Sequence, residues 1–112
     1  MKTLVAGGAG FIGSHMVDRL IKDGHTVTVI DNFSTGRPAN LSHHRGNPRL
    51  NVVEADIGDA AAILPHFKDI DWVFHFAALA DIVPSMERPM DYFTYNVHGT
   101  VQLLEAARRS GI

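Results

Sequence analysis

The sequence predicts an α/β chain in which a parallel sheet carries helices on both faces, and two observations lead to this class. Four short apolar segments with the composition of buried strands recur along the 112 residues, and segments with helical periodicity separate them. Strands that are apolar on both faces and joined by helices form parallel sheets with right-handed crossovers. The expected strand order is 3-2-1-4, the first half of a doubly wound fold with its switch point.

Each expected element follows from its local composition. The expected strands, rich in branched and aromatic residues, are 3–6, 26–30, 50–54 and 70–76. The expected helices are 11–22, a short one over 59–67 with Asp59 as its N-cap, one turn within 84–88, and a long one over 89–110 with Gly111 as its C-cap. Residues 33–49 are rich in Ser, Gly, Pro and Asn, which predicts a loop with one short helix near 38–44.

The turn between the first strand and the first helix carries the most specific pattern in the chain. The segment L-V-A-G-G-A-G-F-I-G-S-H contains Gly13, and Asp31 follows 18 residues later at the end of the second strand. This order of strand, glycine turn, helix, strand and acid is the dinucleotide-binding fingerprint. Gly7 or Gly8 permits the tight turn. Gly10 lets the backbone approach a pyrophosphate, and Gly13 lets the helix pack close to the strand.

The acid at the end of the second strand predicts which dinucleotide binds. The N-terminus of the helix offers N–H groups and about half a unit of positive charge to phosphates. Asp31 can accept two hydrogen bonds from a ribose diol, although Asp31-Asn32 also suits a simple turn. Asp31 would repel a 2′-phosphate, and the only basic residue nearby is Arg37. The sequence therefore predicts NAD in preference to NADP.

Composition excludes several classes of protein. With 46% hydrophobic residues, 20% charged residues and a net charge of -2, the chain is an ordinary globular domain without a basic face for nucleic acid. The apolar runs are far shorter than the roughly 20 residues that span a bilayer, and no signal peptide is expected before the first strand. The absence of cysteine excludes disulfides and is typical of a cytoplasmic chain.

The seven histidines do not predict a metal site. The only close pair is His43-His44, and adjacent residues in a loop rarely chelate one ion without an acid partner at a suitable spacing. His75 lies on a buried strand and is expected to be a hydrogen-bonded core histidine. No metal ligand is therefore assigned.

Five ordered segments together resemble the extended short-chain dehydrogenase/reductase superfamily, and within it the NAD-dependent nucleotide-sugar epimerases and dehydratases. The matching segments are A-G-G-A-G-F-I-G-S-H at 6–15, D-N-F-S-T-G at 31–36, D-I at 56–57, H-F-A-A at 75–78 and the P-x-x-Y-x-x-x-N-x-x-G-T-x-x-L-L-E-A-A pattern over 89–107. Ala6 replaces the family's usual threonine. The resemblance covers essentially the whole chain.

The resemblance implies a doubly wound Rossmann fold that binds NAD, and it implies which residues lie at the cofactor. These are Gly7, Gly10, Phe11, Ile12, Gly13, Asp31, Asn32, Ser34, Gly36, Asp56, Ile57, Phe76, Ala77, Ala78, Ala80 and Asn96. Asp56 and Ile57 are implied to lie against the adenine. The small residues at the end of the fourth strand are implied to leave room for the nicotinamide ribose, or alternatively to allow tight packing. Asn96 is implied to bind backbone near the active site.

The family's catalytic pair, Tyr-x-x-x-Lys, is not found in residues 1–112. Four residues after Tyr92 comes Asn96, and four after Tyr95 comes Gly99. No catalytic residue is assigned, and the whole chain is interpreted as an incomplete NAD-binding domain of a nucleotide-sugar 4-epimerase. The segments D-N-F-S-T-G and A-D-I-V-P-S are most similar to UDP-glucose 4-epimerases. The alternatives are part of a 4,6-dehydratase or a standalone NAD-binding module without chemistry.

The last helix is expected to be an interface. Its apolar residues over 90–110 lie on more than one face of the helix. In the family this helix packs in a dimer interface of four helices, which implies a homodimer, while a further part of the same polypeptide could cover it instead. A UDP-sugar substrate is expected only together with the family's C-terminal part, and neither nucleic acid nor membrane is an expected partner.

Overall fold

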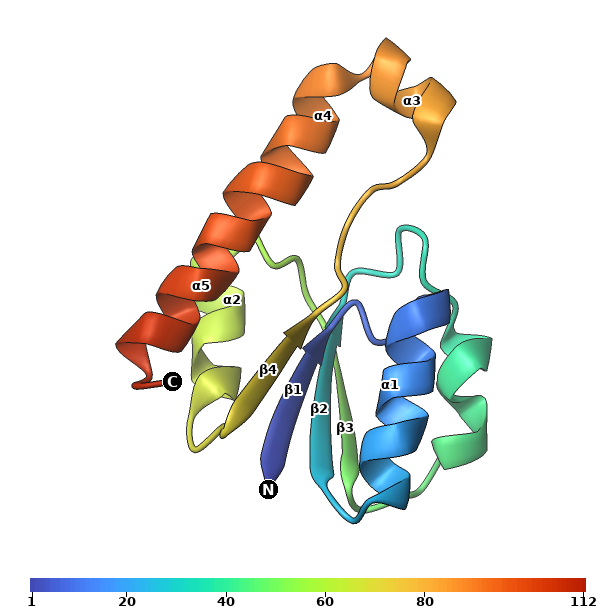
Figure 1. The fold of residues 1–112 in the computed structure, drawn as a ribbon, viewed down its shortest axis with the longest axis vertical. Helices are drawn as coiled ribbons and strands as arrows, with labels where there is room; N and C mark the ends of the chain where they lie inside the picture. Colours follow the sequence, from blue (N-terminus) through green and yellow to red (C-terminus); the bar gives the residue numbers. More distant parts are fainter.

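A computed structural model describes residues 1–112 and contains one four-stranded parallel sheet in the order β3-β2-β1-β4 (Figure 1). The strands are β1 (Lys2–Ala6), β2 (Thr26–Asp31), β3 (Leu50–Glu54) and β4 (Trp72–His75). The predicted class and strand order are confirmed. The fourth strand covers 72–75 and is shorter than the expected 70–76, although backbone hydrogen bonds continue the ladder one residue beyond each end, from the Asp71 N–H to Lys2 and from the Phe76 N–H to Ala6, both at 2.8 Å.

Helices cover both faces of the sheet, as predicted. On one side lie α1 (Phe11–Lys22) and the 3-10 helix η1 (Pro38–His44); on the other lie α2 (Ala60–Ile63), η2 (Leu64–Phe67) and α5 (Gly99–Arg109). The side chain of Asp59 caps α2 by accepting the N–H of Ala62 at 3.2 Å. Successive β1 residues alternate between the two cores: Leu4 packs with Phe67 and Leu103, and Val5 packs with Val17 and Leu20.

The long C-terminal helix is continuous but not uniform. It consists of α4 (Pro89–Phe93), the π-helical turn η3 (Thr94–His98) and α5. Before it, α3 (Ile82–Glu87) is slightly longer than the single turn that was expected. Gly111 ends the helix with a φ of +80°, a conformation that favours glycine. π-helical turns are rare and often lie at functional sites. The residues of η3 are therefore candidates for a functional role.

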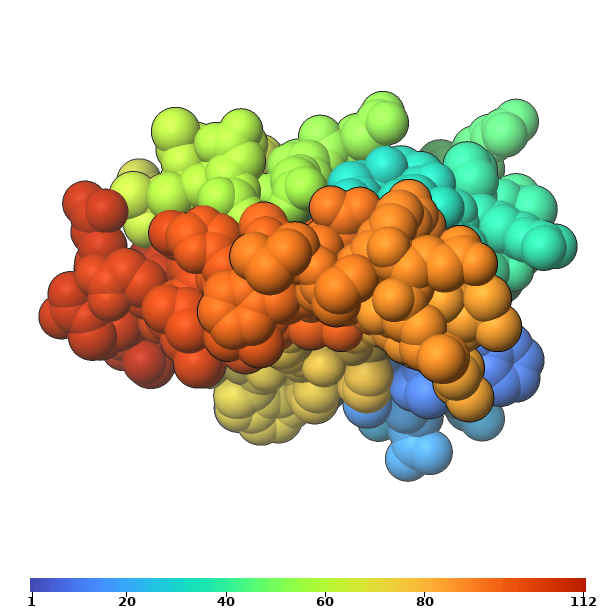
Figure 2. All heavy atoms as spheres, turned by 90° about the horizontal axis from the view of Figure 1, so that it is seen from above, coloured from blue at the N-terminus to red at the C-terminus, as the bar shows by residue number.

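An apolar stripe runs along the exposed side of this helix. Its members, here called the α4–α5 stripe, are Met90, Phe93, Val97, Val101 and Leu104, all between 49% and 69% exposed. Figure 2 shows the helix lying across the molecule with one whole side open. None of the helices has both the length and the apolar character needed to cross a bilayer.

The glycine turn holds β1, α1 and β4 together because its glycines allow very close approach of the backbone. A Cβ on Gly13 would lie 2.1 Å from the carbonyl oxygen of Gly7. Gly7 itself has a φ of +79°, and a Cβ there would lie 2.6 Å from the backbone nitrogen of Ala77. Gly13 therefore packs the helix against the turn, and Gly7 packs the turn against the segment after β4.

We expect Gly13→Ala to lower the free energy of unfolding by about 3 kcal/mol, because the clash outweighs the gain of about 1 kcal/mol in helix propensity. Gly10→Ala is the matched control, since a Cβ at Gly10 would meet only the Gly7 oxygen, at 3.4 Å. This control should cost about 1 kcal/mol as a poorer N-cap. Urea unfolding measures both variants, and equal losses would contradict the packing role of Gly13.

Candidate functional site

The predicted site residues converge at the edge of the sheet where the strands end. The glycine turn follows β1, residues 32–36 follow β2, residues 55–59 follow β3 and residues 76–81 follow β4, and Figure 1 shows all four segments at the same edge. Ligands of open α/β sheets bind at this edge, at the point where the strand order reverses. In this sheet that point lies between β1 and β4.

The glycine turn presents unpaired backbone donors to open space. The turn is fixed by the Gly7 N–H, which donates to Ile30 at 2.8 Å, and by the Gly10 N–H, which donates to Gly7 at 3.2 Å. Gly10 is the N-cap of α1 and no side chain caps the helix, so the N–H groups of its first turn have no intrahelical acceptor. Phe11 and Ile12 in this turn are 79% and 64% exposed. The arrangement has the features of helix N-termini that bind anions in other proteins.

Asp31 is almost fully buried beside this turn, at 7% exposed. Its Oδ2 accepts the backbone N–H of Ala9 at 3.0 Å, and its Oδ1 accepts that of Phe33 at 2.8 Å. An ionised carboxylate offers about four acceptor positions, so two are left for a ligand. Asp31 therefore both fixes the surrounding backbone and keeps the capacity to bind a diol. The sequence suggested a turn role for Asp31, which the bond from Phe33 confirms, but it did not predict the bond from Ala9.

The segment after β2 wraps around Asp31. A Cβ on Gly36 would lie 2.8 Å from Oδ2 of Asp31, so the backbone passes directly over the carboxylate. Asn32 accepts the N–H of Ser34 at 3.0 Å and closes a local turn. Phe33 has a φ of 58°, a conformation that bulky residues rarely adopt. Strained residues of this kind gather at ligand-binding segments.

A groove of about 1250 Å³ extends from this segment across the end of the sheet. Three predicted residues line it: Asn32, Ser34 and Asp56. The glycine turn, Asp31 and Ala77 do not, so the candidate site consists of the turn and of the adjoining groove. The groove is also lined by residues that the sequence analysis did not assign, among them Thr35, Arg88, Tyr95 and His98. The packing of the final helix over the sheet places Tyr95 and His98 there.

Tyr95 is the most perturbed ionisable group of the groove. Burial of the phenol, together with the negative charges of Asp56 and Asp31, raises the pKa of Tyr95 to about 12. The hydroxyl therefore remains a proton donor over the physiological pH range. The sequence analysis excluded Tyr95 as a catalytic tyrosine because no lysine follows it, and its position in the π-helical turn became apparent only in the fold.

Asn96, the next residue in the π-helical turn η3, holds the segment after β4 in place by hydrogen bonds. Its Oδ1 accepts the N–H of Leu79 and its Nδ2 donates to the carbonyl of Leu79, both at 2.8 Å. The implied role in binding backbone is confirmed, while contact with a cofactor stays a prediction. Thr100 donates to the Asn96 carbonyl, and His75 contacts the Thr100 hydroxyl at 2.8 Å. Because that hydroxyl has already used its proton, the His75 Nε2 must be the donor.

Some of the remaining predicted site residues are packed in the interior, and others are exposed to solvent. Ala77 is 6% exposed and lies against Gly7, which favours tight packing, while Ala78 and Ala80 are exposed. Phe76 continues the ladder through its N–H to Ala6 at 2.8 Å. Ile57 is buried beneath α5, so it offers a ligand only its backbone. His75 was expected to be a core histidine; it is hydrogen-bonded but only half-buried, and burial lowers its pKa.

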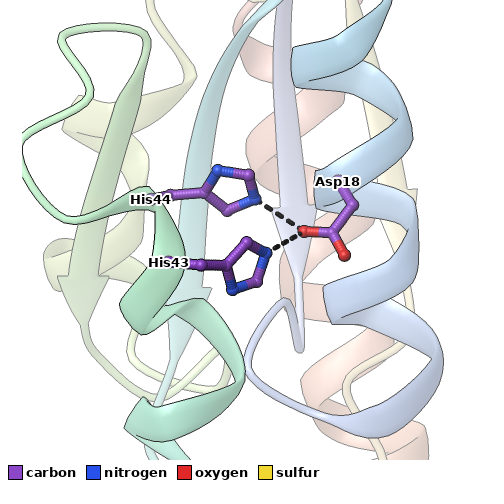
Figure 3. Close-up of side chains that lie close together, drawn as sticks. All are labelled: Asp18, His43 and His44. Carbon is purple, nitrogen blue, oxygen red and sulfur yellow. Dashed lines mark hydrogen bonds and ion pairs between the residues drawn. The ribbon is translucent and has the colours of Figure 1, made fainter.

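One cluster of ionisable groups lies outside this site. His43 and His44 of η1 both contact the carboxylate of Asp18 on α1, as Figure 3 shows. No metal ligand was predicted from the sequence, because no acid stands at a suitable spacing from this pair. The structure supplies that partner from 25 residues earlier in the chain.

Residues 3–112 match the model of the NAD dependent epimerase/dehydratase family. The chain belongs to this family. It is 46% identical over 114 residues to the UDP-glucose 4-epimerase of Mycolicibacterium smegmatis, covering 100% of this chain and 36% of that protein. It is 40% identical to UDP-glucuronic acid decarboxylase 2 of Arabidopsis thaliana, covering 99% of this chain and 24% of that protein.

Solved structures of the family share the fold. The crystal structure of DesIV, a dTDP-glucose 4,6-dehydratase from Streptomyces venezuelae with NAD bound, superimposes with a TM-score of 0.95 at 36% identity, covering 100% of this chain and 37% of that one. The chain thus spans about a third or less of the length of these relatives. These relatives have different activities, although each of them matches this chain over all or nearly all of its length.

The raised pKa of Tyr95 predicts a loss of stability in alkali. An unfolded tyrosine loses its proton near pH 10, whereas the folded chain holds it to about pH 12. Between these values the unfolded state binds fewer protons than the folded state, so the free energy of unfolding falls as pH rises. Tyr95→Phe should remove this part of the slope. Urea unfolding of both proteins across this range measures it, and parallel pH profiles would contradict the assignment.

Proposed function

We propose that residues 1–112 are the NAD-binding domain of a nucleotide-sugar 4-epimerase. One observation carries the proposal: a Cβ at Gly10 would make no contact closer than 3.4 Å, at the uncapped N-terminus of α1 and close to the fixed carboxylate of Asp31. A pyrophosphate next to a ribose diol has the chemistry that such a pair of features binds. The family's dependence on NAD supports the same cofactor.

The residues of this chain would bind and orient the cofactor. The first turn of α1 would receive the pyrophosphate, and Asp31 would accept hydrogen bonds from the adenosine ribose. Asn32, Ser34 and Asp56 would lie along the adenosine end in the groove. NAD, when bound, supplies transient acceptance of a hydride from C4 of the sugar. Asn96 would hold the segment after β4, with Ala78 and Ala80, against the nicotinamide end.

The proton transfer of the reaction is not assigned to any residue described here. Tyr95 lacks the lysine that would lower its pKa, and its pKa is raised instead. Binding of the UDP-sugar and acid–base chemistry at its 4-hydroxyl therefore belong, in this proposal, to the remainder of a protein of the relatives' length. We propose a cytoplasmic location for it, consistent with the absence of cysteine from these residues.

Two observations favour an epimerase over the alternatives. The identity of 46% to a UDP-glucose 4-epimerase exceeds the 36% to the structurally similar 4,6-dehydratase. The segments at 31–36 and 80–85 are also those most similar to 4-epimerases. A dehydratase remains the second candidate because its crystal structure superimposes so closely. A standalone NAD-binding module would retain the same cofactor site without a reaction.

NAD should bind more tightly than NADP, and Gly10→Val should abolish the binding of both through a clash with the phosphates. The fold should tolerate this change because a Cβ at Gly10 has space. Asp31→Ala should weaken NAD binding by about tenfold to a hundredfold, the worth of one or two charge-assisted hydrogen bonds. Isothermal titration calorimetry measures the affinities. A thermal melt of each variant separates lost binding from the loss of the Asp31 bonds to Ala9 and Phe33.

NAD affinity of Gly10→Val within a few-fold of the original would refute the site. The reaction is tested separately on the full-length protein, with UDP-glucose and dTDP-glucose as substrates. Formation of UDP-galactose supports the epimerase, and loss of water from the hexose supports the dehydratase. NAD binding without turnover of either sugar nucleotide supports the standalone module.

The α4–α5 stripe is proposed as the contact surface of a homodimer, as the family resemblance implies. Val101→Glu should shift the protein from dimer to monomer in sedimentation velocity, because it places a charge in the middle of the stripe. Val83→Glu on α3 is the matched control, since Val83 is equally exposed but lies outside the stripe. An unchanged sedimentation coefficient for Val101→Glu would place the interface elsewhere.

A further inference from the structure

The cluster of Asp18, His43 and His44 has no part in the proposed dinucleotide site. In Figure 3 both imidazole rings project from η1 toward one carboxylate on α1, and both reach the same oxygen. The Nε2 of His43 lies 2.7 Å from Oδ1 of Asp18, and the Nε2 of His44 lies 2.6 Å from it. The three ligand atoms all lie within 4.8 Å of one another.

The charge state of Asp18 determines which groups donate in the cluster. Partial burial acts to raise the pKa of Asp18, but the hydrogen bonds from His44 and His43 outweigh it and lower the pKa. The carboxylate is therefore ionised and can only accept, so each Nε2 carries the donated hydrogen. Moving that hydrogen to Nδ1 gives the other neutral tautomer and leaves a lone pair on each Nε2, aimed at the carboxylate.

We propose that Asp18, His43 and His44 bind one divalent transition-metal ion of the zinc class. Two imidazole nitrogens and one carboxylate oxygen form a ligand set that zinc accepts, with water in the fourth position, whereas magnesium and calcium favour oxygen ligands. Ligand atoms in a tetrahedral zinc site lie about 3.3 Å apart, given zinc–ligand distances of about 2.0–2.1 Å. Each Nε2 must therefore move less than 1 Å away from the carboxylate oxygen, and the two histidine ligand atoms, which lie within 4.8 Å of each other, must also come to about 3.3 Å apart.

The elements that carry these ligands are held in place independently of the cluster. Leu41 anchors η1 in the core that also contains Val17 and Leu20 of α1. At the start of η1, the side chain of Asn40 donates to the carbonyl of Ala9 at 2.8 Å. The ligands are thus presented by two packed helices, which favours preorganised binding. Side-chain exposures of 43% for Asp18 and 53% for His43 leave the ion a path from solvent.

A bound ion would join η1 to α1 and so close the segment between them. That segment contains Asn32 and Ser34, which line the groove. The ion would add a third restraint to this segment, besides Leu41 in the core and Asn40 on the glycine turn. The metal site is nevertheless a separate inference, because its ligands contact neither the glycine turn nor Asp31.

Titration of the full-length protein without a polyhistidine tag tests the site, with Zn²⁺ as the probe in calorimetry. We expect one high-affinity ion per chain, and Asp18→Asn, His43→Ala and His44→Ala should each weaken binding by roughly a hundredfold because two ligands remain. Asp18→Asn keeps the size of the side chain at an exposed position, so loss of folding does not obscure its result. His66→Gln is the matched control, a histidine on η2 outside the cluster, and should bind as the original does.

A second probe reports the geometry. Co²⁺ should produce the visible absorption of a four-coordinate site in the original protein and in His66→Gln, but not in Asp18→Asn. Zinc affinity that is equal in Asp18→Asn and His66→Gln would overturn the proposal, as would Mg²⁺ binding as tightly as Zn²⁺. NAD affinity is measured separately in the absence of metal, so failure of this site and failure of the dinucleotide site are distinguishable.

Discussion

The close approach of backbone at the glycine turn is the constraint on which the rest of the structure depends. At Gly7, Gly8 and Gly13 an added Cβ would lie 2.1–2.8 Å from neighbouring atoms, which belong to the segment after β4, to β2 and to the turn itself. Helix, sheet and turn therefore meet at distances that no other residue permits. Gly10 differs because its missing Cβ leaves space, and that space faces the ligand edge. One short segment thus sets both the packing and the site.

The turn also depends on a buried charge. Asp31 would be costly at 7% exposure if its carboxylate were unpaired, but the N–H groups of Ala9 and Phe33 satisfy it. Those two bonds join the turn after β1 to the segment after β2. The carboxylate that would recognise a ribose is therefore also the group that holds the two binding segments in their relative positions. Recognition of the ribose and rigidity of the two binding segments would therefore depend on the same side chain.

Local signals made most of the fold predictable from the sequence. Strand 50–54, helix 11–22 and the short helix 38–44 follow from composition and periodicity, and the handedness of crossovers fixed the strand order. The candidate dinucleotide site could be proposed from the sequence because its residues lie on one turn and at strand ends. The pairing of Asp18 with His43 was not, because it joins residues of two helices through tertiary packing. The raised pKa of Tyr95 likewise depends on burial, which no local pattern encodes.

The chain of polar contacts from His75 through Thr100 and Asn96 to Leu79 determines how the final helix is aligned with the sheet. Contacts between apolar side chains alone would allow the helix to shift along the sheet by one turn, because one methyl group can replace another. Hydrogen bonds do not allow this shift, because each donor needs its acceptor at one position along the helix. Large apolar residues under α5 should thus be free to change identity over evolutionary time, while the side chains of His75, Asn96 and Thr100 keep the helix at a constant position relative to the cofactor edge.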